Sequence, residues 1–221
     1  MSRDRASEAL RALQAQADPA IRDQLGPRYG IHTPNALGVP MSAIKALGKR
    51  LGKDHDLALA LWDTGVYEAR TLAGFVDDPA LVTAAQMDAW VADFDTWAIV
   101  DSTCFNLFDR VPAAWDKVHE WATREEEMVK RAAFALLWAL ALHDRTAPDA
   151  RFSAALPLVE PAATDTRHLV EKAVSMALRA VGRMRPALRP ECLAIAERLA
   201  ASDDPSSRRV GRPALKELLP A

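Results

Sequence analysis

An aromatic side chain and a carboxylate, Trp97 and Asp101, lie four residues apart in a stretch with helical periodicity. This spacing places both side chains on one face of a helix, one turn apart. Because the neighbours Ile99 and Val100 are apolar, we expect Asp101 to enter a largely buried segment, where a carboxylate needs a partner or has a task. A cationic substrate group beside the indole would supply both a counter-charge and a cation–π contact.

The elements that position this pair are predicted to be helices throughout. Apolar residues recur with helical spacing, good helix formers are frequent, and no stretch alternates with the period of a strand. The pattern predicts helices over residues 3–17, 19–26, 40–52, 55–62, 66–76, 79–93, 95–109, 112–122, 124–143, 149–160, 165–184, 187–201 and 205–218. Predicted helix starts are Ser42, Asp78-Pro79, Thr123 and Asp204-Pro205.

Short helices joined by short turns favour an all-α solenoid of stacked helix pairs, folded as a single domain over residues 1–221. No repeated motif stands out, so any repeat is degenerate. The segment 124–143 is the most apolar and is predicted to lie at the centre of the stack. The Gly- and Pro-rich tract 26–40 is the longest irregular piece, and loops of that length often carry function.

Charge is strongly segregated along the chain, although the formal net charge is only −2. Residues 1–53 carry nine basic and four acidic side chains, residues 54–127 carry four and sixteen, and residues 167–221 carry eleven and six. The near-neutral total argues against a general nucleic-acid binder. The basic ends still permit a local DNA-binding face, because only the field near the phosphates matters.

Several classes of protein are excluded or disfavoured by the sequence. There is no apolar run long enough for a membrane span and no signal-peptide pattern at the N-terminus. Cys104 and Cys192 are predicted to be buried free thiols of a cytoplasmic protein, and the five histidines are scattered. Neither a metal cluster nor a phosphate-binding loop occurs, so we expect no metal and no cofactor. A monomer is expected.

Several islands of sequence lie in one order and at compatible spacings. They are Arg28-Tyr29 with Leu37-Gly38-Val39, Leu61-Trp62, Trp97 to Ser102, Lys130 to Ala133, Glu171 to Arg179, and Ser207-Arg208-Arg209. Through them the chain resembles the AlkD-type DNA alkylation repair glycosylases, over about residues 28–216. The resemblance implies a right-handed superhelix of HEAT-like antiparallel helix pairs, whose concave basic face holds duplex DNA.

The same resemblance implies an activity and its residues. The family excises purines alkylated at N3 or N7 by hydrolysing the N-glycosidic bond, and it does so without base flipping, unlike most glycosylases. Asp101 matches the catalytic carboxylate, Trp97 the neighbouring aromatic, and Arg131 the arginine that holds the backbone near the lesion. Tyr29 matches an aromatic near the DNA. The implied partner is double-stranded DNA carrying alkylated bases.

The chemistry fits these residue types. An alkylated purine is cationic and leaves without a general acid, so a fixed carboxylate that stabilises the oxocarbenium-like sugar and orients water is sufficient. Further DNA-binding residues are predicted in two basic clusters and beside them: Lys172, Met176, Arg179, Arg208 and Arg209. Met176 stands where the family has a second cleft tryptophan, and it offers no extended π face.

Each of these residues also has a purely structural interpretation. Trp97 could pack in the core, Asp101 could cap a helix or pair with a buried arginine, and Arg131 could pair with an acidic residue, Asp101 included. The basic clusters could be solvated helix faces. Because Met176 replaces an aromatic, two alternative functions stay open: a non-catalytic DNA-binding paralogue of the same fold, and a protein-binding helical scaffold.

Overall fold

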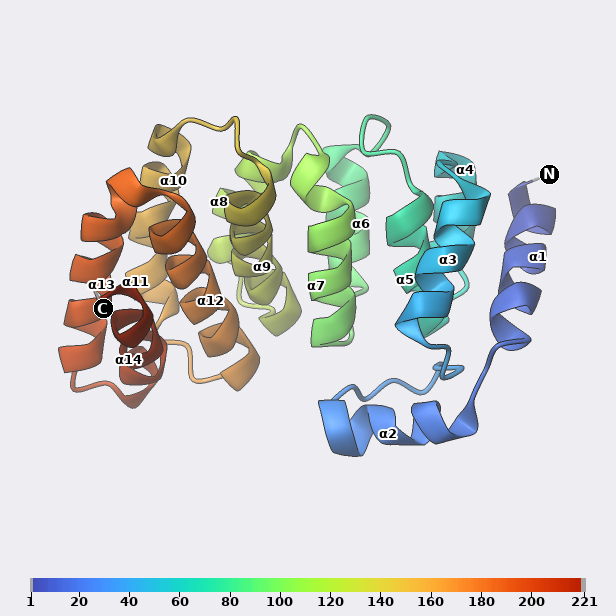
Figure 1. Ribbon diagram of the computed structural model, residues 1–221, viewed down its shortest axis with the longest axis horizontal. Helices are drawn as coiled ribbons and strands as arrows, with labels where there is room; N and C mark the ends of the chain where they lie inside the picture. The colour runs from blue at the N-terminus through green and yellow to red at the C-terminus, as the bar shows by residue number, and fades with distance from the viewer. Residues whose placement is uncertain (1, 220–221) are drawn as a thin grey trace. The chain divides into compact units, whose positions relative to one another are not determined.

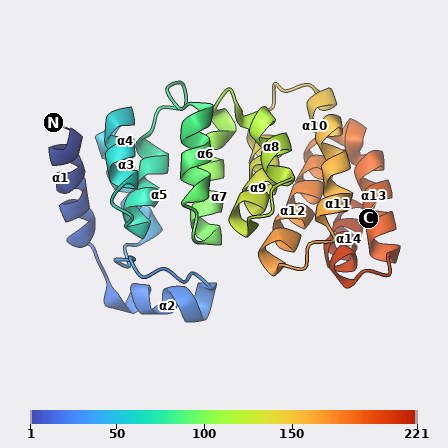
Figure 2. The same ribbon diagram turned by 180° about the vertical axis from the view of Figure 1, so that it is seen from behind.

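The computed structural model describes residues 2–219. Within this range every regular element is a helix and no strand occurs, which confirms the all-α prediction. The chain forms two compact units, one ending at Val111 and the other beginning at Pro112 (Figure 1, Figure 2). That these units together make one domain over 1–221 stays a prediction.

The N-terminal unit is built around α5. Its helices are α1 (Ser2–Gln14), α2 (Pro19–Tyr29), α3 (Met41–Leu51), α4 (His55–Trp62), α5 (Tyr67–Val76), α6 (Ala84–Ala92), α7 (Trp97–Asn106) and the 3-10 helix η1 (Phe108–Arg110). α5 packs against α3, α4 and α7, and α1 packs against α4. Between α4 and α6 the rings of Trp62 and Trp90 stack with centroids 3.9 Å apart, which fills the core with aromatic area.

Helix α2 lies across the ends of the other helices of its unit rather than beside them (Figure 1, Figure 2), and none of its residues is buried. The loop that follows it is held by Glu68, a buried carboxylate of α5. Glu68 accepts the backbone N–H groups of Leu37, Gly38 and Val39 at 2.9, 2.7 and 3.2 Å. These bonds satisfy the buried charge and fix the path of the chain from α2 back to α3.

The C-terminal unit has two layers of helices. Its elements are α8 (Ala114–Ala122), α9 (Glu127–His143), α10 (Asp149–Ala155), η2 (Leu156–Leu158), α11 (Val159–Ala162), α12 (His168–Met184), η3 (Pro186–Leu188), α13 (Arg189–Ala201) and α14 (Pro205–Leu218). α12 packs against α9 on one side and α14 on the other, while α8 packs on α9 and α13 on α14. The apolar segment predicted to be central is α9, which is buried over most of its length.

A repeat that no sequence motif shows is visible in the contacts of this unit. Hydrogen bonds between successive helix pairs join residues 38 apart: Arg131–Leu169, Ser153–Glu191, Arg179–Glu217, Arg198–Glu160 and Arg209–Glu171. In the N-terminal unit the bonds to Glu68 span 29 to 31 residues, and the bond from Trp62 to Asp93 spans 31. The stacked helix pairs of the sequence prediction are therefore present, with a shorter repeat before Val111 than after it.

Some predicted helix boundaries are wrong because turn chemistry overrides helix periodicity. Residues 79–83 are not helical: Asp78 accepts the N–H of Ala80 at 3.0 Å, which closes a turn. α6 begins only after Thr83, whose Oγ1 accepts the N–H of Gln86 at 3.1 Å. Conversely, α2 continues through Pro27 to Tyr29 and ends at Gly30 in the left-handed conformation.

Of the four predicted helix starts, the one at Asp204-Pro205 is confirmed, and those at Asp78-Pro79, Ser42 and Thr123 are wrong. Asp204 accepts the N–H of Ser207 at 2.6 Å and begins α14 as predicted. Ser42 lies inside α3, which begins after Pro40. Thr123 follows α8 instead of starting α9, because its Oγ1 donates to the carbonyl of Glu120 at 3.0 Å.

We predict that Gly38→Ala destabilises the protein more than Gly30→Ala. Both glycines have positive φ, +85° and +64°, so an alanine at either costs about 1–2 kcal/mol in backbone strain. At Gly38 a Cβ atom would also lie 2.2 Å from the carbonyl oxygen of Asp18, whereas nothing lies within 4 Å at Gly30. We expect Gly38→Ala to lower the free energy of unfolding in urea by about 3 kcal/mol or more. Equal losses in the two variants would contradict the close approach of this loop to the start of α2.

Candidate nucleic-acid interface

Trp97 and Asp101 lie on the less buried stripe of α7. The helix begins after Thr96, whose Oγ1 accepts the N–H of Ile99 at 3.3 Å. Ile99 and Val100 have no exposed surface, whereas Trp97 and Asp101 are both partly exposed. Asp101 is thus less buried than its apolar neighbours suggest, and it shares its stripe with the indole one turn before it.

Trp97 also connects α7 to α2. Its indole Nε1 donates to the carbonyl oxygen of Tyr29 at 3.0 Å, across 68 residues of sequence. The Tyr29 side chain is 47% exposed, and the guanidinium of Arg28 lies 5.2 Å from the centre of its ring. The structure therefore brings together Trp97 and Tyr29, which come from separate islands of the sequence.

Arg131 belongs to the C-terminal unit and is only 3% exposed. From α9 its Nη1 donates to the carbonyl oxygen of Leu169 at 2.7 Å, in the first turn of α12. The guanidinium thus ties two successive helix pairs together. A contact with a DNA phosphate requires it to become exposed, and its role in holding the backbone stays a prediction.

Helix α12 exposes a single stripe with a strong positive charge. Lys172, Met176, Arg179 and Arg183 follow one another at three- or four-residue intervals, so they line up along one face. The opposite face of α12 is buried and consists mainly of alanine, valine and leucine. Since α9 and α14 cover its two sides, this stripe is the part of α12 that is left for a partner.

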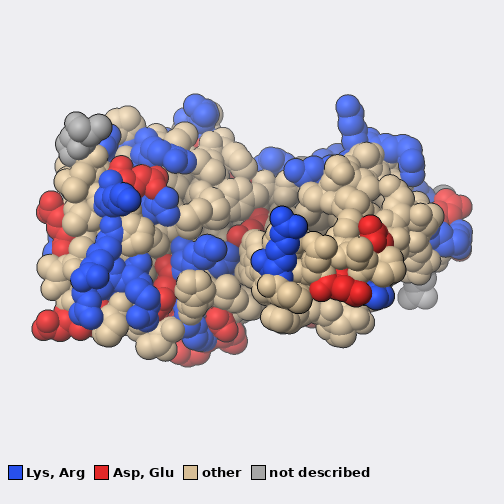
Figure 3. All heavy atoms as spheres, turned by 60° about the horizontal axis from the view of Figure 1, so that its bottom comes forward, with Lys and Arg blue, Asp and Glu red and all other residues tan. Residues whose placement is uncertain are grey.

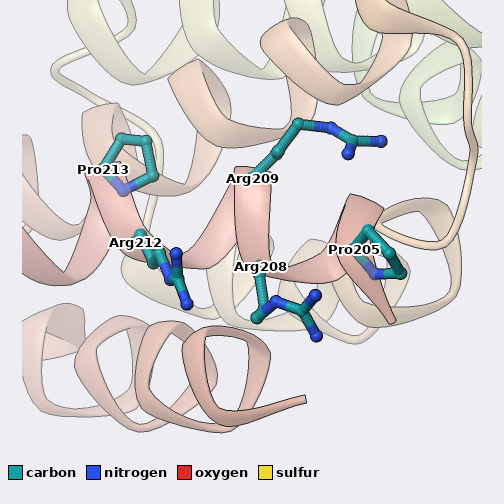
Figure 4. Close-up of a pocket in the computed structure, with 5 residues that line it drawn as sticks. All are labelled: Pro205, Arg208, Arg209, Arg212 and Pro213. Carbon is teal, nitrogen blue, oxygen red and sulfur yellow. The ribbon is translucent and has the colours of Figure 1, made fainter. Parts of the chain in front are cut away.

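Helix α14 extends the stripe into a basic groove. An open groove of about 360 Å³ is lined by His168, Glu171, Lys172, Ser175, Met176, Arg179, Arg209 and Pro213. A second hollow of about 430 Å³ over α14 is lined by Pro205, Arg208, Arg209, Arg212 and Pro213 (Figure 4). We call the two together the α12/α14 groove. Lys and Arg side chains gather over this part of the C-terminal unit, on the left of Figure 3.

The cations of the α12/α14 groove are held in different ways. Within the described residues Lys172 and Arg212 make neither an ion pair nor a hydrogen bond. Arg208 donates from Nη1 to the carbonyl oxygens of Ser202 and Asp203 at 2.8 and 2.7 Å, at the end of α13. In Figure 4, Arg208 and Arg212 point to one side of α14 and Arg209 to the other. Both sides of this helix therefore present positive charge.

Arg209 is fixed by a buried carboxylate. Its Nε donates to Glu171 Oε2 at 2.9 Å, and its Nη2 donates to Ser206 Oγ at 3.0 Å. The side chain of Glu171 is 5% exposed, whereas that of Arg209 is 54% exposed. Hydrogen bonds from Arg209 hold the pKa of Glu171 below its usual value although burial acts to raise it. Glu171 is thus ionised at neutral pH and orients Arg209 in the groove.

Met176 lines the groove between Lys172 and Arg179. Its Sδ accepts a hydrogen bond from Nη1 of Arg179 at 3.4 Å. A thioether fills space here and contacts a cation, but it provides no aromatic face for a base or a sugar. Four predicted DNA-binding residues, namely Lys172, Met176, Arg179 and Arg209, therefore meet in one place, and Arg208 lines the adjoining hollow.

Sequence reasoning placed Arg212 in the basic cluster near the C-terminus, but it missed two carboxylates that hold arginines of α12 and α14. Arg212 lies four residues after Arg208, and this helical spacing accounts for the side of α14 that the two share. The carboxylates Glu171 and Glu217 had no signal of their own. Their role is visible only from the 38-residue spacing that pairs them with Arg209 and Arg179.

The family described as DNA alkylation repair enzyme matches residues 9–216. The chain belongs to this family. A solved structure described as "A new family of proteins related to the HEAT-like repeat DNA glycosylases with affinity for branched DNA structures" superposes with a TM-score of 0.79 at 21% identity, covering 96% of this chain and 93% of the other. No curated protein matches.

These matches confirm the fold, which is HEAT-like and all-helical, and place the chain among DNA alkylation repair proteins. In the described part of this family member, no helix is long and apolar enough to cross a membrane. The same residues contain no group of three or more His, Cys, Asp or Glu side chains that could hold a metal ion. Cys104 and Cys192 are buried thiols, as predicted, and burial raises the pKa of Cys192 to about 12.

We predict that Glu171→Gln lowers stability near neutral pH but not in acid. The folded pKa of Glu171 lies below the unfolded value, so the pair with Arg209 stabilises the fold above the unfolded pKa of about 4.3, and this contribution is lost as the pH falls through the folded pKa. We expect a loss of about 1 kcal/mol in urea unfolding at pH 7, a modest value because Arg209 is largely exposed and screened.

The difference between wild type and Glu171→Gln should shrink at pH 3. Glu197 is exposed on α13 and makes no ion pair among the described residues, so Glu197→Gln is the matched control and should change little at either pH. A loss that is equally large at pH 3 and pH 7 would show that the ionised pair does not cause it.

Proposed function

We propose that this protein is a DNA repair glycosylase that excises purines alkylated at N3 or N7 from duplex DNA, without flipping the damaged base. The observation that carries the proposal is the placement of Trp97 and Asp101 on one partly exposed stripe of α7, in a chain of the DNA alkylation repair family. The reaction is hydrolysis of the N-glycosidic bond. The protein acts as a cytoplasmic monomer and needs neither a cofactor nor a metal.

In this mechanism Asp101 is the catalytic carboxylate. The alkylated purine departs as a neutral base, because its positive charge takes up the bonding electrons of the glycosidic bond. The sugar left behind has oxocarbenium character, which an adjacent carboxylate stabilises while it orients the attacking water. Trp97 contacts the deoxyribose and adds cation–π stabilisation through its indole face. Its hydrogen bond to the Tyr29 carbonyl sets the orientation of the ring and keeps Tyr29 near the DNA.

The duplex is held by the basic side chains of the C-terminal unit. Lys172, Arg179, Arg208 and Arg209 bind phosphates from the α12/α14 groove, and Met176 fills the space between them. Arg131 supports the backbone near the lesion, and its bond to Leu169 keeps α9 and α12 together. Phosphate contacts of this kind fix the position of the DNA without reading its sequence.

We predict that Asp101→Asn removes most of the excision activity. The purified wild-type protein should release N3-methyladenine or N7-methylguanine from methylated duplex DNA. The amide keeps the size of the carboxylate but not its charge, so the rate should fall about 100- to 1000-fold. Release of free base, measured by chromatography at enzyme excess, tests this directly.

Asp63→Asn provides the matched control, because Asp63 is exposed at the end of α4 and loses the same charge. Its excision rate should stay within about twofold of wild type, as for most exposed positions away from a site. Absence of base release by the wild-type protein, under conditions where an active glycosylase releases base, would overturn the enzymatic proposal.

A second candidate function is binding of branched DNA without excision. It is favoured by Met176, which provides no aromatic surface in the groove, and by the affinity for branched DNA that is described for the protein of the superposed structure. On this alternative, a four-way junction binds more tightly than a linear duplex of equal length at two salt concentrations, and neither DNA loses a base. Equal affinity for the two DNAs together with base release supports the glycosylase instead.

A further inference from the structure

One carboxylate in the C-terminal unit is shared by two arginines of the exposed stripe of α12. Glu217, near the end of α14, accepts a hydrogen bond at Oε2 from Nε of Arg179, and Nη2 of Arg179 forms an ion pair with the same oxygen. Its other oxygen, Oε1, lies 3.5 Å from Nη1 of Arg183, one turn further along α12. The positive charges of Arg179 and Arg183 therefore face the single negative charge of Glu217, and the cluster retains a net charge of +1.

The pair formed by Glu217 differs from the pair formed by Glu171 in exposure. The Glu171 side chain is 5% exposed, so removal of Arg209 would leave a buried charge without its partner, which is strongly unfavourable. The Glu217 side chain is 26% exposed, and its partners Arg179 and Arg183 are 30% and 59% exposed. Water can replace an arginine at Glu217, and ion pairs of this kind contribute little to stability.

We propose that Glu217 competes with DNA phosphates for Arg179 and Arg183 and thereby weakens the DNA binding of the α12/α14 groove. A phosphate and a carboxylate accept from a guanidinium in the same forked geometry, so one replaces the other without moving the arginine. When DNA binds, Glu217 turns to water and Arg179 passes to a phosphate. Glu171 stays bound to Arg209 and acts only as a positioning residue. This inference rests on the DNA binding proposed above.

The consequence is a groove that selects for closely spaced phosphates. An isolated anion gains little by displacing Glu217, because one arginine–Glu217 ion pair is lost for each arginine–anion pair that forms. A nucleic-acid backbone brings neighbouring phosphates to both Arg179 and Arg183, while Lys172 and Arg212 are already available to it. Glu217 thus lowers binding to scattered anions more than binding to DNA.

Glu217→Gln tests this, with Glu160→Gln as the matched control. Glu160 pairs with Arg198 over the same 38-residue spacing, at 2.8 Å, but on α11 and α13 in the other layer of the unit. Both variants lose one charge and release one or two arginines. We expect Glu217→Gln to bind a linear duplex about three- to tenfold more tightly near 0.1 M salt, with a salt-dependence slope steeper by about one to two counterions. Glu160→Gln should match wild type within about twofold.

Arg179→Ala in the Glu217→Gln background should remove most of the gain in DNA affinity. If the glutamine of Glu217→Gln still hydrogen-bonds to Arg179 and hides the gain, Glu217→Ala should show it. Thermal unfolding checks that each variant is folded. Equal affinities of Glu217→Gln and Glu160→Gln, with unchanged slopes, would overturn this inference and leave DNA binding intact. Failure of wild type and all variants to bind DNA would instead overturn the proposed function, and this inference with it.

Discussion

The arrangement of the C-terminal unit depends on how α12 is enclosed. α9 and α14 pack along its two sides and α13 also packs against it, so the direction in which α12 turns its apolar face is fixed. A helix enclosed in this way keeps one stripe for solvent, and here that stripe carries Lys172, Met176, Arg179 and Arg183. The chemistry of the groove is therefore fixed by core packing, since any rotation of α12 would bury charged side chains at a large free-energy cost.

The ties between helix pairs explain why the repeat was hidden in the sequence. Hydrogen bonds recur at 38 residues, but the groups and their order vary: Arg131 donates to a backbone carbonyl, and in the arginine–glutamate pairs the arginine comes first at Arg179 and second at Arg198. A motif search looks for identical residues, whereas packing requires only equivalent positions. The helical periodicity was sufficient to predict the all-α fold and the stacked pairs. The helical periodicity could not predict the number of residues in each repeat.

The candidate site was predictable in part, and for reasons that differ between residues. The basic stripe of α12 follows from helical spacing alone, which is why Lys172 and Arg179 lie together as expected. The burial of Arg131 and the exposure of Asp101 depend on which neighbouring helices cover them, and local sequence does not contain that information. The hydrogen bond from Trp97 to the carbonyl of Tyr29 joins residues 68 apart and involves a main-chain atom, so no pattern of side chains could predict it.

The spacing of the inter-pair bonds also determines where the chain can change length during evolution. An added residue inside α12 or α14 would rotate everything after it by about 100° and break the partners of Arg179 and Arg209 together. An added residue in a connecting segment leaves both helices in register and only alters the count between them. The 31-residue spacing before Val111 is shorter than the 38-residue spacing after it by about two helical turns, and the helices differ as well: α3, α5 and α7 have 11, 10 and 10 residues, whereas α9 and α12 have 17. Homologous chains should therefore differ in length at their turns, or by whole helical turns, because both kinds of change keep the paired positions on the same helix faces.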